Sequence, residues 1–466
     1  MSHLGFVERP LKSLLEAADW HDAPLERLTI EHFSPVLATA WPIAPMASAA
    51  IAAVGLAASR LHELRCGERH HIHLDTRCAE LAMASSTYLL VDGQAAKFRD
   101  PFTGFYRAAE GGWVYLHGNF PHLRNGLLAM LKVDNSPGDI RAAVARRAAG
   151  DLEAEAISLG LCAARVRNRA EWTGELQAQR ETSCPPLQIN CLGSTPRRDF
   201  PPAGERPLSE LRMLDLSRVI AGPMAGRTMA EHGATVLRVA SPKLPFIESL
   251  VIDTGFGKHS TFLDLGEETG RRTLLGLVES CDVFLDAYRP SALAARGLGA
   301  ADLSLVRPDL VSVSLSAFSR GGPWAGRRGY DSLVQSTMGM ASSSPDDTPG
   351  LLPCQPLDYI TGYLAAFAAL VGLIRRHQEG GRWHASLSLS ATAAWMWRMR
   401  DELGDNLDPP AANPQTADVL AFSDVYETDF GSVTALRPPL RMNRVGTEWS
   451  RVPVPLGRDP ARWPHG

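Results

Sequence analysis

Short apolar runs alternate with helical patterns in the second half of the chain. Met213–Leu216 and Thr235–Val239 are apolar runs typical of buried strands. Between them, the tight Ala221-Gly222-Pro223 turn leads into a helix that is predicted to end near Gly233. This order of strand, turn, helix and strand predicts a nucleotide-binding βαβ unit. The unit lacks G-x-G-x-x-G and has no acidic residue at the end of its second strand, so it does not predict an NAD or FAD site.

The alternation continues downstream, with strands predicted at 282–286 and 310–316 and a long apolar helix at 358–376. Strands that alternate with helices predict an α/β fold with a parallel sheet. The longest apolar runs, at 43–59 and 363–374, are each followed by arginine and histidine and are too short or too broken to cross a bilayer. We therefore expect core helices at these places and no membrane partner.

Part of the chain is repeated. Gly67–Leu74 matches Gly380–Leu387, and each segment follows an alanine-rich helical pattern and precedes another helix. A hairpin is predicted over 100–116, with its turn at Glu110-Gly111-Gly112. Proline, glycine and charged residues replace any periodic pattern at 193–207, which we predict to be a linker.

Composition narrows the classes of function. The 466 residues are 45% hydrophobic and 21% charged, as in an ordinary globular enzyme. The net charge of -4 gives no overall attraction to nucleic acid, although a local basic pocket for a phosphorylated ligand is compatible with it. The seven cysteines form no C-x-x-C pair, so we expect no disulfide framework and a reducing cytosol. The amino terminus shows no secretory pattern, which also predicts a cytoplasmic location.

Histidines gather at two places in the first half. His70, His71 and His73 lie together, and His117 and His122 form a second group. Neither group has the neighbouring carboxylate or cysteine that usually completes a metal site. The sequence therefore predicts no bound metal.

Several short motifs occur in one order between residues 219 and 331. They are Val219-Ile220-Ala221-Gly222-Pro223, Gly257-Lys258-His259-Ser260 with Leu263-Asp264-Leu265, Tyr288-Arg289-Pro290, Gly321-Gly322-Pro323 and Gly329-Tyr330-Asp331. Together they resemble the family III (CaiB/BaiF) CoA-transferases. The resemblance implies a Rossmann-like parallel sheet in a nucleotide-binding half, a smaller α+β domain, and an interlocked homodimer.

The resemblance covers residues 34–460, with the two halves in the reverse of the usual family order. It implies four segments. We expect an amino-terminal arm at 1–33, a small-domain-like half at 34–192, the linker at 193–207, and a CoA-binding half with the nucleophile at 208–466.

Asp358 is the candidate catalytic residue. It lies just before the predicted apolar helix, where backbone amides and the positive helix end favour the ionised carboxylate. On sequence alone a helix-capping role is the simpler interpretation. The resemblance implies instead a nucleophile that attacks an acyl-CoA thioester, gives a mixed anhydride, and then becomes an enzyme thioester. The matching segment of the first repeat, 38–62, contains no Asp or Glu, so the chain offers one such nucleophile.

The expected small-molecule partners are an acyl-CoA and a carboxylic acid, with coenzyme A held through its phosphates. Arginine forks and bare backbone amides suit phosphate groups. The candidate CoA-binding residues are Ala221, Gly222, Arg238, Lys258, Arg289 and Arg296. Among them, Arg289 and Arg296 match basic positions of the family.

Two alternatives stay open. The first is an acyl-CoA racemase or isomerase of the same family. It is disfavoured because Tyr330 stands where racemases carry histidine and because 116–122 contains no glutamate, whereas moving an α-proton needs two acid/base groups. The second is a catalytically silent CoA-binding subunit, since the family's glycine-rich loop is not evident at 92–103.

Overall fold

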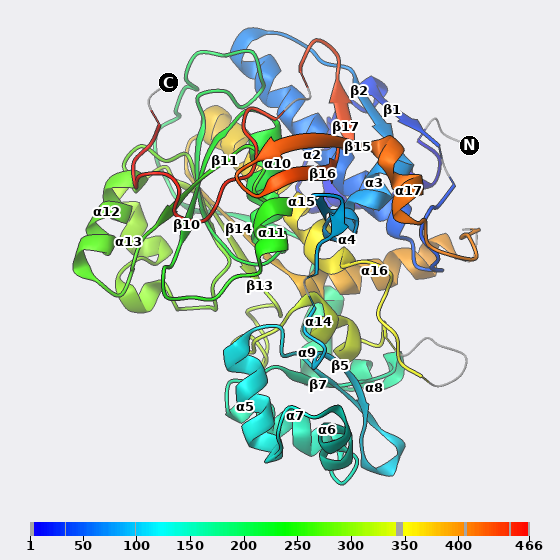
Figure 1. Cartoon of the computed structure of the whole chain (residues 1–466). Helices are drawn as coiled ribbons and strands as arrows, with labels where there is room; N and C mark the ends of the chain where they lie inside the picture. Colours follow the sequence, from blue (N-terminus) through cyan, green and yellow to red (C-terminus); the bar gives the residue numbers. More distant parts are fainter. Residues whose placement is uncertain are drawn as a thin grey trace.

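The computed structural model describes residues 4–32, 34–97, 99–341, 348–404, 408–446 and 449–464 (Figure 1). Its centre is a seven-stranded sheet in the order β11-β10-β9-β12-β13-β14-β8. The first six strands of that order run parallel, and β8 pairs antiparallel with β14 at the edge. The strands are β8 (Gln188–Gly193), β9 (Arg212–Leu216), β10 (Thr235–Ala240), β11 (Lys258–Phe262), β12 (Val283–Asp286), β13 (Val311–Ser316) and β14 (Arg382–Ser388). The predicted α/β fold with a parallel sheet is confirmed.

The order of the strands reverses at the middle of the sheet. From β9 the chain moves outward to β10 and β11, then returns to the other side of β9 and moves outward through β12, β13 and β14. In such sheets a ligand crevice opens beyond the carboxyl ends of the strands at the reversal. The fold therefore places its natural crevice beside the ends of β9 and β12.

Helices cover both faces of this sheet because alternate strand residues point to opposite faces. Met213 packs in one hydrophobic core with α10 (Ala221–Glu231) and α15 (Pro356–Glu379). Its neighbour Leu214 packs in another core with α12 (Glu268–Val278) and α13 (Ala300–Val306). Figure 1 shows α12 and α13 at the outer left of the molecule.

Two long apolar helices fill the centre of the protein. The helix α2 (Ile43–Cys66) packs against α15, and each is followed by a strand and another helix, as the repeat predicts. Both are long and apolar enough to cross a membrane, but most or all of their apolar residues are buried inside the protein. The expectation of core helices is confirmed, and both helices are longer than the apolar runs suggest.

Strands from both sides of the linker share sheets. A three-stranded sheet has the order β1-β2-β17, and a four-stranded sheet has the order β15-β16-β3-β4. The strands are β1 (Leu28–Glu31), β2 (Ile72–Asp75), β3 (Leu90–Val91), β4 (Gln94–Ala95), β15 (Ser423–Thr428), β16 (Gly431–Leu436) and β17 (Leu440–Met442). The division of the chain into four segments stays a prediction, and these sheets join elements across it.

A small lobe lies below the central sheet in Figure 1. It contains the antiparallel strands β5 (Gly104–Arg107), β6 (Trp113–Leu116) and β7 (Ala163–Arg165), with α5 (Pro121–Leu131), α6 (Pro137–Val144) and α7 (Ala149–Ser158). Strands β5 and β6 form the predicted hairpin.

The remaining α-helices of the described residues lie elsewhere along the chain. They are α1 (Glu8–Ala17), α3 (Thr76–Ala82), α4 (Ser85–Tyr88), α8 (Arg169–Thr173), α9 (Leu176–Ser183), α11 (Glu248–Asp253), α14 (Asp331–Thr337), α16 (Leu389–Leu403) and α17 (Thr416–Val419).

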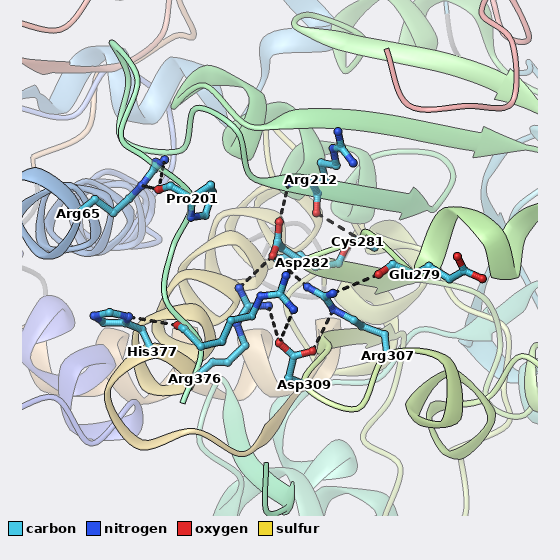
Figure 2. Close-up of polar contacts among 12 residues, drawn as sticks. Arg65, Pro201, Arg212, Glu279, Cys281, Asp282, Arg307, Asp309, Arg376 and His377 are labelled. Carbon is cyan, nitrogen blue, oxygen red and sulfur yellow. Dashed lines mark hydrogen bonds and ion pairs between the residues drawn. The ribbon is translucent and has the colours of Figure 1, made fainter. Parts of the chain in front are cut away.

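A buried ion network fixes the carboxyl-terminal part of α15 at the amino ends of the strands (Figure 2). Arg376 Nη2 donates to Asp282 Oδ1 at 3.0 Å, and the backbone amide of Arg212 donates to Asp282 Oδ2 at 3.1 Å. Arg307 pairs with Asp309 at 3.0 Å in the same network. Because a helix rises by about 1.5 Å per residue, the first turn of α15 then lies at the opposite, carboxyl-end edge of the sheet.

Candidate active site

A cleft with a volume of about 880 Å³ lies beyond the carboxyl ends of the parallel strands. Residues that follow four of these strands line it, namely Arg218 after β9, Ser241 after β10, Tyr288 after β12 and Ala317 after β13. The cleft thus occupies the crevice that the strand order creates.

The cleft brings together most of the residues predicted from the sequence. Asp358, Ala221, Gly222, Arg289 and Arg296 all line it. They come from the first turns of α15 and α10 and from the loop after β12, which meet at this edge of the sheet. A carboxylate and two arginines therefore face one cavity, as a site for a phosphorylated acyl donor requires.

Further basic side chains line the same cleft. They are His122, Arg218, Lys243, Arg327 and Arg328. Arg296 donates to the carbonyl of Ala292 at 2.7 Å, and Lys243 pairs with Asp264 at 2.6 Å. The excess of positive charge suits the phosphates of coenzyme A, which guanidinium groups bind through paired N–H donors. The sequence analysis did not single out Arg218, Arg327 or Arg328.

Lys258 is placed away from the cleft. Its side chain is 2% exposed, and its Nζ donates to Asp215 Oδ2 at 2.8 Å and to the carbonyl of Pro223 at 2.6 Å. Burial lowers the pKa of Lys258 to about 8, although the Asp215 carboxylate opposes this shift. Lys258 therefore holds β11, β9 and the start of α10 together in the interior, where it cannot reach a ligand in the cleft.

Arg238 is also buried and does not line the large cleft. Its Nε and Nη1 atoms have no hydrogen-bond partner among the described residues. Burial lowers its pKa. The side chain lines a narrow cavity of about 30 Å³ together with Arg218 and Ser241, which also line the cleft. The structure thus places Arg238 behind the cleft wall rather than on its surface.

Gly222 is required by packing at the start of α10. A Cβ atom at this position would lie 2.3 Å from Cβ of Ser217 and 3.0 Å from Cβ of Ala287. Any side chain would push the helix away from the turn after β9. The glycine lets the amino end of α10 reach the cleft. Close packing therefore explains this glycine, in addition to the ligand approach expected from the sequence.

Asp358 lies in the first turn of α15 rather than before it, and Asp331 caps that turn. The backbone amides of Leu357 and Asp358 donate to Asp331 Oδ2 at 2.8 and 3.1 Å. Gln335 donates a short hydrogen bond to the other oxygen of Asp331. The Asp358 carboxyl is thus not used as the helix cap, which leaves it available to the cleft.

Both carboxyl groups have raised pKa values. Burial, and then the charge of Asp331, raise the pKa of Asp358 well above its usual value. Burial raises the pKa of Asp331 to about 7. The expectation that the helix end would hold Asp358 ionised is therefore wrong, because burial and a neighbouring carboxylate outweigh the helix end. At neutral pH the pair retains a proton.

A second cavity, of about 40 Å³, meets Asp358 from the side of the small lobe. Arg99, His117, Asn119 and Gln355 contribute polar groups to its lining. Asp358 lines both this cavity and the large cleft. Asp358 is therefore the residue at which the large cleft and the small cavity meet.

His117 is a site residue that the sequence analysis treated only as a metal candidate. Its ring stacks on Tyr330 with centroids 4.1 Å apart and planes 12° apart. Burial, and then Arg99, lower the pKa of His117 to about 3, so the ring is neutral at neutral pH. The sequence offered one signal for this role. His117 directly follows the predicted hairpin strand β6, and in the structure the end of that strand lies beside Tyr330.

Comparison with known proteins shows which sequences this chain is similar to. Residues 208–438 match the family described as CoA-transferase family III. The chain is 32% identical to the acetyl-coenzyme A transferase nodX of Hypoxylon pulicicidum over 42% of this chain and 35% of that protein. It is 31% identical to the probable fatty acyl-CoA transferase Rv3272 of Mycobacterium tuberculosis over 38% of this chain and 48% of that protein.

A crystal structure of Rv3272 from M. tuberculosis aligns with 42% of this chain and 57% of that chain, at 29% identity and a TM-score of 0.40. The chain spans 35% and 48% of the length of these two curated relatives. The matched residues 208–438 include the strands of the parallel sheet from β9 to β14, the cleft arginines and Asp358.

Proposed function

From the premise that residues 208–438 form a domain of CoA-transferase family III, we propose that the protein transfers coenzyme A between carboxylic acids, with Asp358 as the nucleophile. One observation carries this proposal. Asp358 lies where a large cleft lined with arginines meets a small cavity, so that one carboxyl group faces both parts of an acyl-CoA.

The proposed reaction begins with attack by a carboxylate oxygen of Asp358 on the thioester carbonyl carbon. The C–S bond breaks, CoA thiolate leaves, and a mixed anhydride remains on Asp358. The thiolate then attacks the Asp358 carbonyl and releases the donor acid as a carboxylate, which leaves an Asp358–CoA thioester. The acceptor carboxylate repeats these steps in reverse and regenerates Asp358, so atoms and charge balance without another reactant.

Attack requires the ionised form of Asp358, whereas the carboxyl pair retains a proton at neutral pH. We propose that this proton resides on Asp358 before acyl-CoA binds and must leave before attack, because the donors to Asp331 favour the ionised form of that residue. Asp331 accepts two backbone N–H bonds on Oδ2 and a hydrogen bond from Gln335 on its other oxygen. Asp331 is thus a positioning residue that fixes the helix turn and the charge of its neighbour.

Coenzyme A is proposed to lie in the large cleft with its phosphates near Arg289 and Arg296. Both arginines are exposed at the cleft surface, where they can form charge-assisted bonds. The amino end of α10, at Ala221 and Gly222, offers backbone amides to the same space. Lys258 and Arg238 have no contact role in this proposal, because their side chains are buried.

Racemisation is less well supported by the site. A racemase needs two groups that exchange protons near neutral pH on either side of the α-carbon. His117 lines the small cavity together with Asp358, and its pKa of about 3 makes it a weak proton acceptor. Tyr330 stands beside it, with its pKa raised by burial, and cannot replace it as a base.

A transfer assay tests the proposed function. The full chain is incubated with a panel of short-chain acyl-CoA donors and free carboxylic acids in deuterated water, and new acyl-CoA species are identified by mass spectrometry. Transfer predicts acyl-CoA formed from the acceptor acid, lost in Asp358→Asn, with no deuterium at the α-carbon. Deuterium uptake without transfer indicates a racemase, and CoA binding without either reaction indicates a silent subunit. Either result would overturn the proposal.

The cytoplasmic location, expected from the cysteines and the amino terminus, stays a proposal, as does the homodimer, which the family resemblance implies. Sedimentation of the purified chain tests the second of them directly. A molar mass near 101 kDa, twice the 50.5 kDa of the chain, supports a dimer, and a mass near 50.5 kDa contradicts it.

A further inference from the structure

A compact group of potential ligands lies far from the catalytic residues in the fold, at the end of α2. His62, Glu68 and His70 place their ligand atoms within 4.8 Å of one another, and we refer to them as the histidine cluster. Both histidines are buried, at 3% and 1% exposure, while Glu68 is exposed. The sequence analysis rejected a metal here because it saw no carboxylate company, but the turn after α2 supplies Glu68.

The two rings face each other through nitrogen atoms. His62 Nδ1 lies 2.6 Å from His70 Nε2, and the rings are parallel to within 5°. His70 Nδ1 lies 2.9 Å from the carbonyl oxygen of Asn443, which can only accept a hydrogen bond. The proton of a neutral His70 is therefore on Nδ1, and its Nε2 presents a lone pair toward His62.

A neutral His62 ring can donate Nδ1–H to His70 Nε2, or it can carry its proton on Nε2 and leave Nδ1 free as a ligand. In the second tautomer the two facing nitrogen atoms offer their lone pairs to one cation.

The second nitrogen of His70 is held by a backbone carbonyl, at 2.9 Å from the oxygen of Asn443. Such a carbonyl is a usual outer partner of a metal-bound imidazole, because it fixes the tautomer and the ring orientation.

The second repeat provides an internal control for this position. The residues that match His62, Glu68 and His70 are Arg375, Gly381 and Trp383, which contain no metal ligand. There Arg375 lies over the Trp383 ring at 5.0 Å from its centroid. The same helix-strand junction is thus stabilised by an ordinary cation–π contact in one copy, so the fold itself does not demand a buried pair of histidines.

We propose that His62 Nδ1, His70 Nε2 and a carboxylate oxygen of Glu68 bind one divalent zinc-class cation, with water as a further ligand. Two imidazoles and one carboxylate form a ligand set that Zn²⁺ accepts in tetrahedral geometry. At Zn–N distances of about 2.0–2.1 Å the two nitrogens lie about 3.3 Å apart. Binding therefore requires the rings to separate by less than 1 Å from their present distance.

The cation would join the two parts of the chain at the linker. Arg65, one turn after His62, donates to the carbonyls of Pro201 at 3.1 Å and Pro207 at 2.7 Å (Figure 2 shows the first contact). Gly204 lies between these two residues in the sequence, within the same linker segment. The ion would therefore stabilise the attachment of 193–207 to α2, and this role does not depend on the proposed transferase activity.

The test uses the full chain stripped of metal by a chelator and titrated with Zn²⁺ alone in a calorimeter. We expect one equivalent of Zn²⁺ per chain, at least tenfold weaker binding in Glu68→Gln, and slower proteolysis at 193–207 when Zn²⁺ is present. Co²⁺ in place of Zn²⁺ should give the visible absorption of a four-coordinate site. His73→Gln is the matched control, because His73 is an exposed neighbour on β2 and should leave binding unchanged.

The double variant His62→Arg with His70→Trp copies the second repeat and should abolish binding. If this variant does not fold, the Glu68→Gln variant provides the test. The Glu68 side chain is exposed, so its replacement leaves the core intact. The proposal is overturned if the wild-type chain binds no stoichiometric Zn²⁺, or if Glu68→Gln binds it as tightly as the wild type.

Discussion

The carboxylate of Asp331 accepts the backbone N–H of Asp358 at 3.1 Å and so caps the helix that carries the proposed nucleophile. The same proximity couples the two acids, since the charge of Asp331 raises the pKa of Asp358. Burial raises the pKa of Asp358 most, and Asp331 adds to this shift while also fixing the position of the helix turn. The first two predictions follow from this relationship.

Asp358→Asn should stabilise the protein more at pH 8 than at pH 5. Raised carboxyl pKa values mean that the folded state binds more protons than the unfolded state, so wild-type stability falls as pH rises from about 4 through the folded pKa values. The loss is at most about 1.4 kcal/mol per pH unit for one group. Urea unfolding at both pH values measures the difference, and an equal effect at both would contradict the coupling.

Asp331→Asn should shift the pH dependence of CoA transfer toward lower pH. The amide oxygen can still cap α15, but the charge that raises the pKa of Asp358 is gone, so Asp358 ionises more easily. Asp331→Ala is the companion variant, because it also removes the cap and should lower the free energy of unfolding by about 0.5–2 kcal/mol. An unchanged rate profile in Asp331→Asn would show that the pair is not coupled.

Replacing Arg289 and Arg296 together by alanine should weaken CoA binding by about 1.5–3 kcal/mol for each charge-assisted bond lost. The binding should also become less sensitive to salt, since fewer charges then contact phosphate. Calorimetry at two salt concentrations provides the measurement. Arg272→Ala is the control, because Arg272 is 72% exposed, pairs with Glu268 and does not line the cleft. Equal affinities in the double variant and the control would remove CoA phosphates from this part of the cleft.

Lys258→Met should destabilise the fold by about 3–5 kcal/mol, because it leaves the buried Asp215 carboxylate without its cation. Adding Asp215→Leu should recover part of this loss. The folded fraction of the single variant should bind CoA with unchanged affinity, as expected for a side chain outside the cleft. A selective loss of CoA affinity without loss of stability would instead favour the role in ligand binding predicted from the sequence.

Much of the sheet could be predicted because strands of a parallel sheet are covered on both faces and appear as short apolar runs. The runs at 213–216, 282–286 and 310–316 therefore correspond to β9, β12 and β13. The gathering of Asp358 with Arg289 and Arg296 in one cleft was predictable for a related reason, since loops after parallel strands meet at one edge.

Other features depend on contacts between residues distant in sequence. The partner that changes the ionisation of Asp358 is Asp331, 27 residues earlier, and no local pattern reveals that their carboxyl groups meet. Lys258 follows a flexible-looking turn, but burial against Asp215 decides its direction. The sharing of sheets across the linker, as in the pairing of β8 with β14, likewise follows from tertiary packing.

The central claim is that Asp358 becomes covalently acylated, and mass spectrometry of the trapped enzyme tests it most directly. The full chain is incubated with the acyl-CoA donors of the transfer assay and then treated with hydroxylamine, followed by peptide mapping. We predict a mass change confined to Asp358, absent from Asp358→Asn, which should still bind CoA. Modification of another residue, or equal modification of the Asp358→Asn protein, would contradict the account.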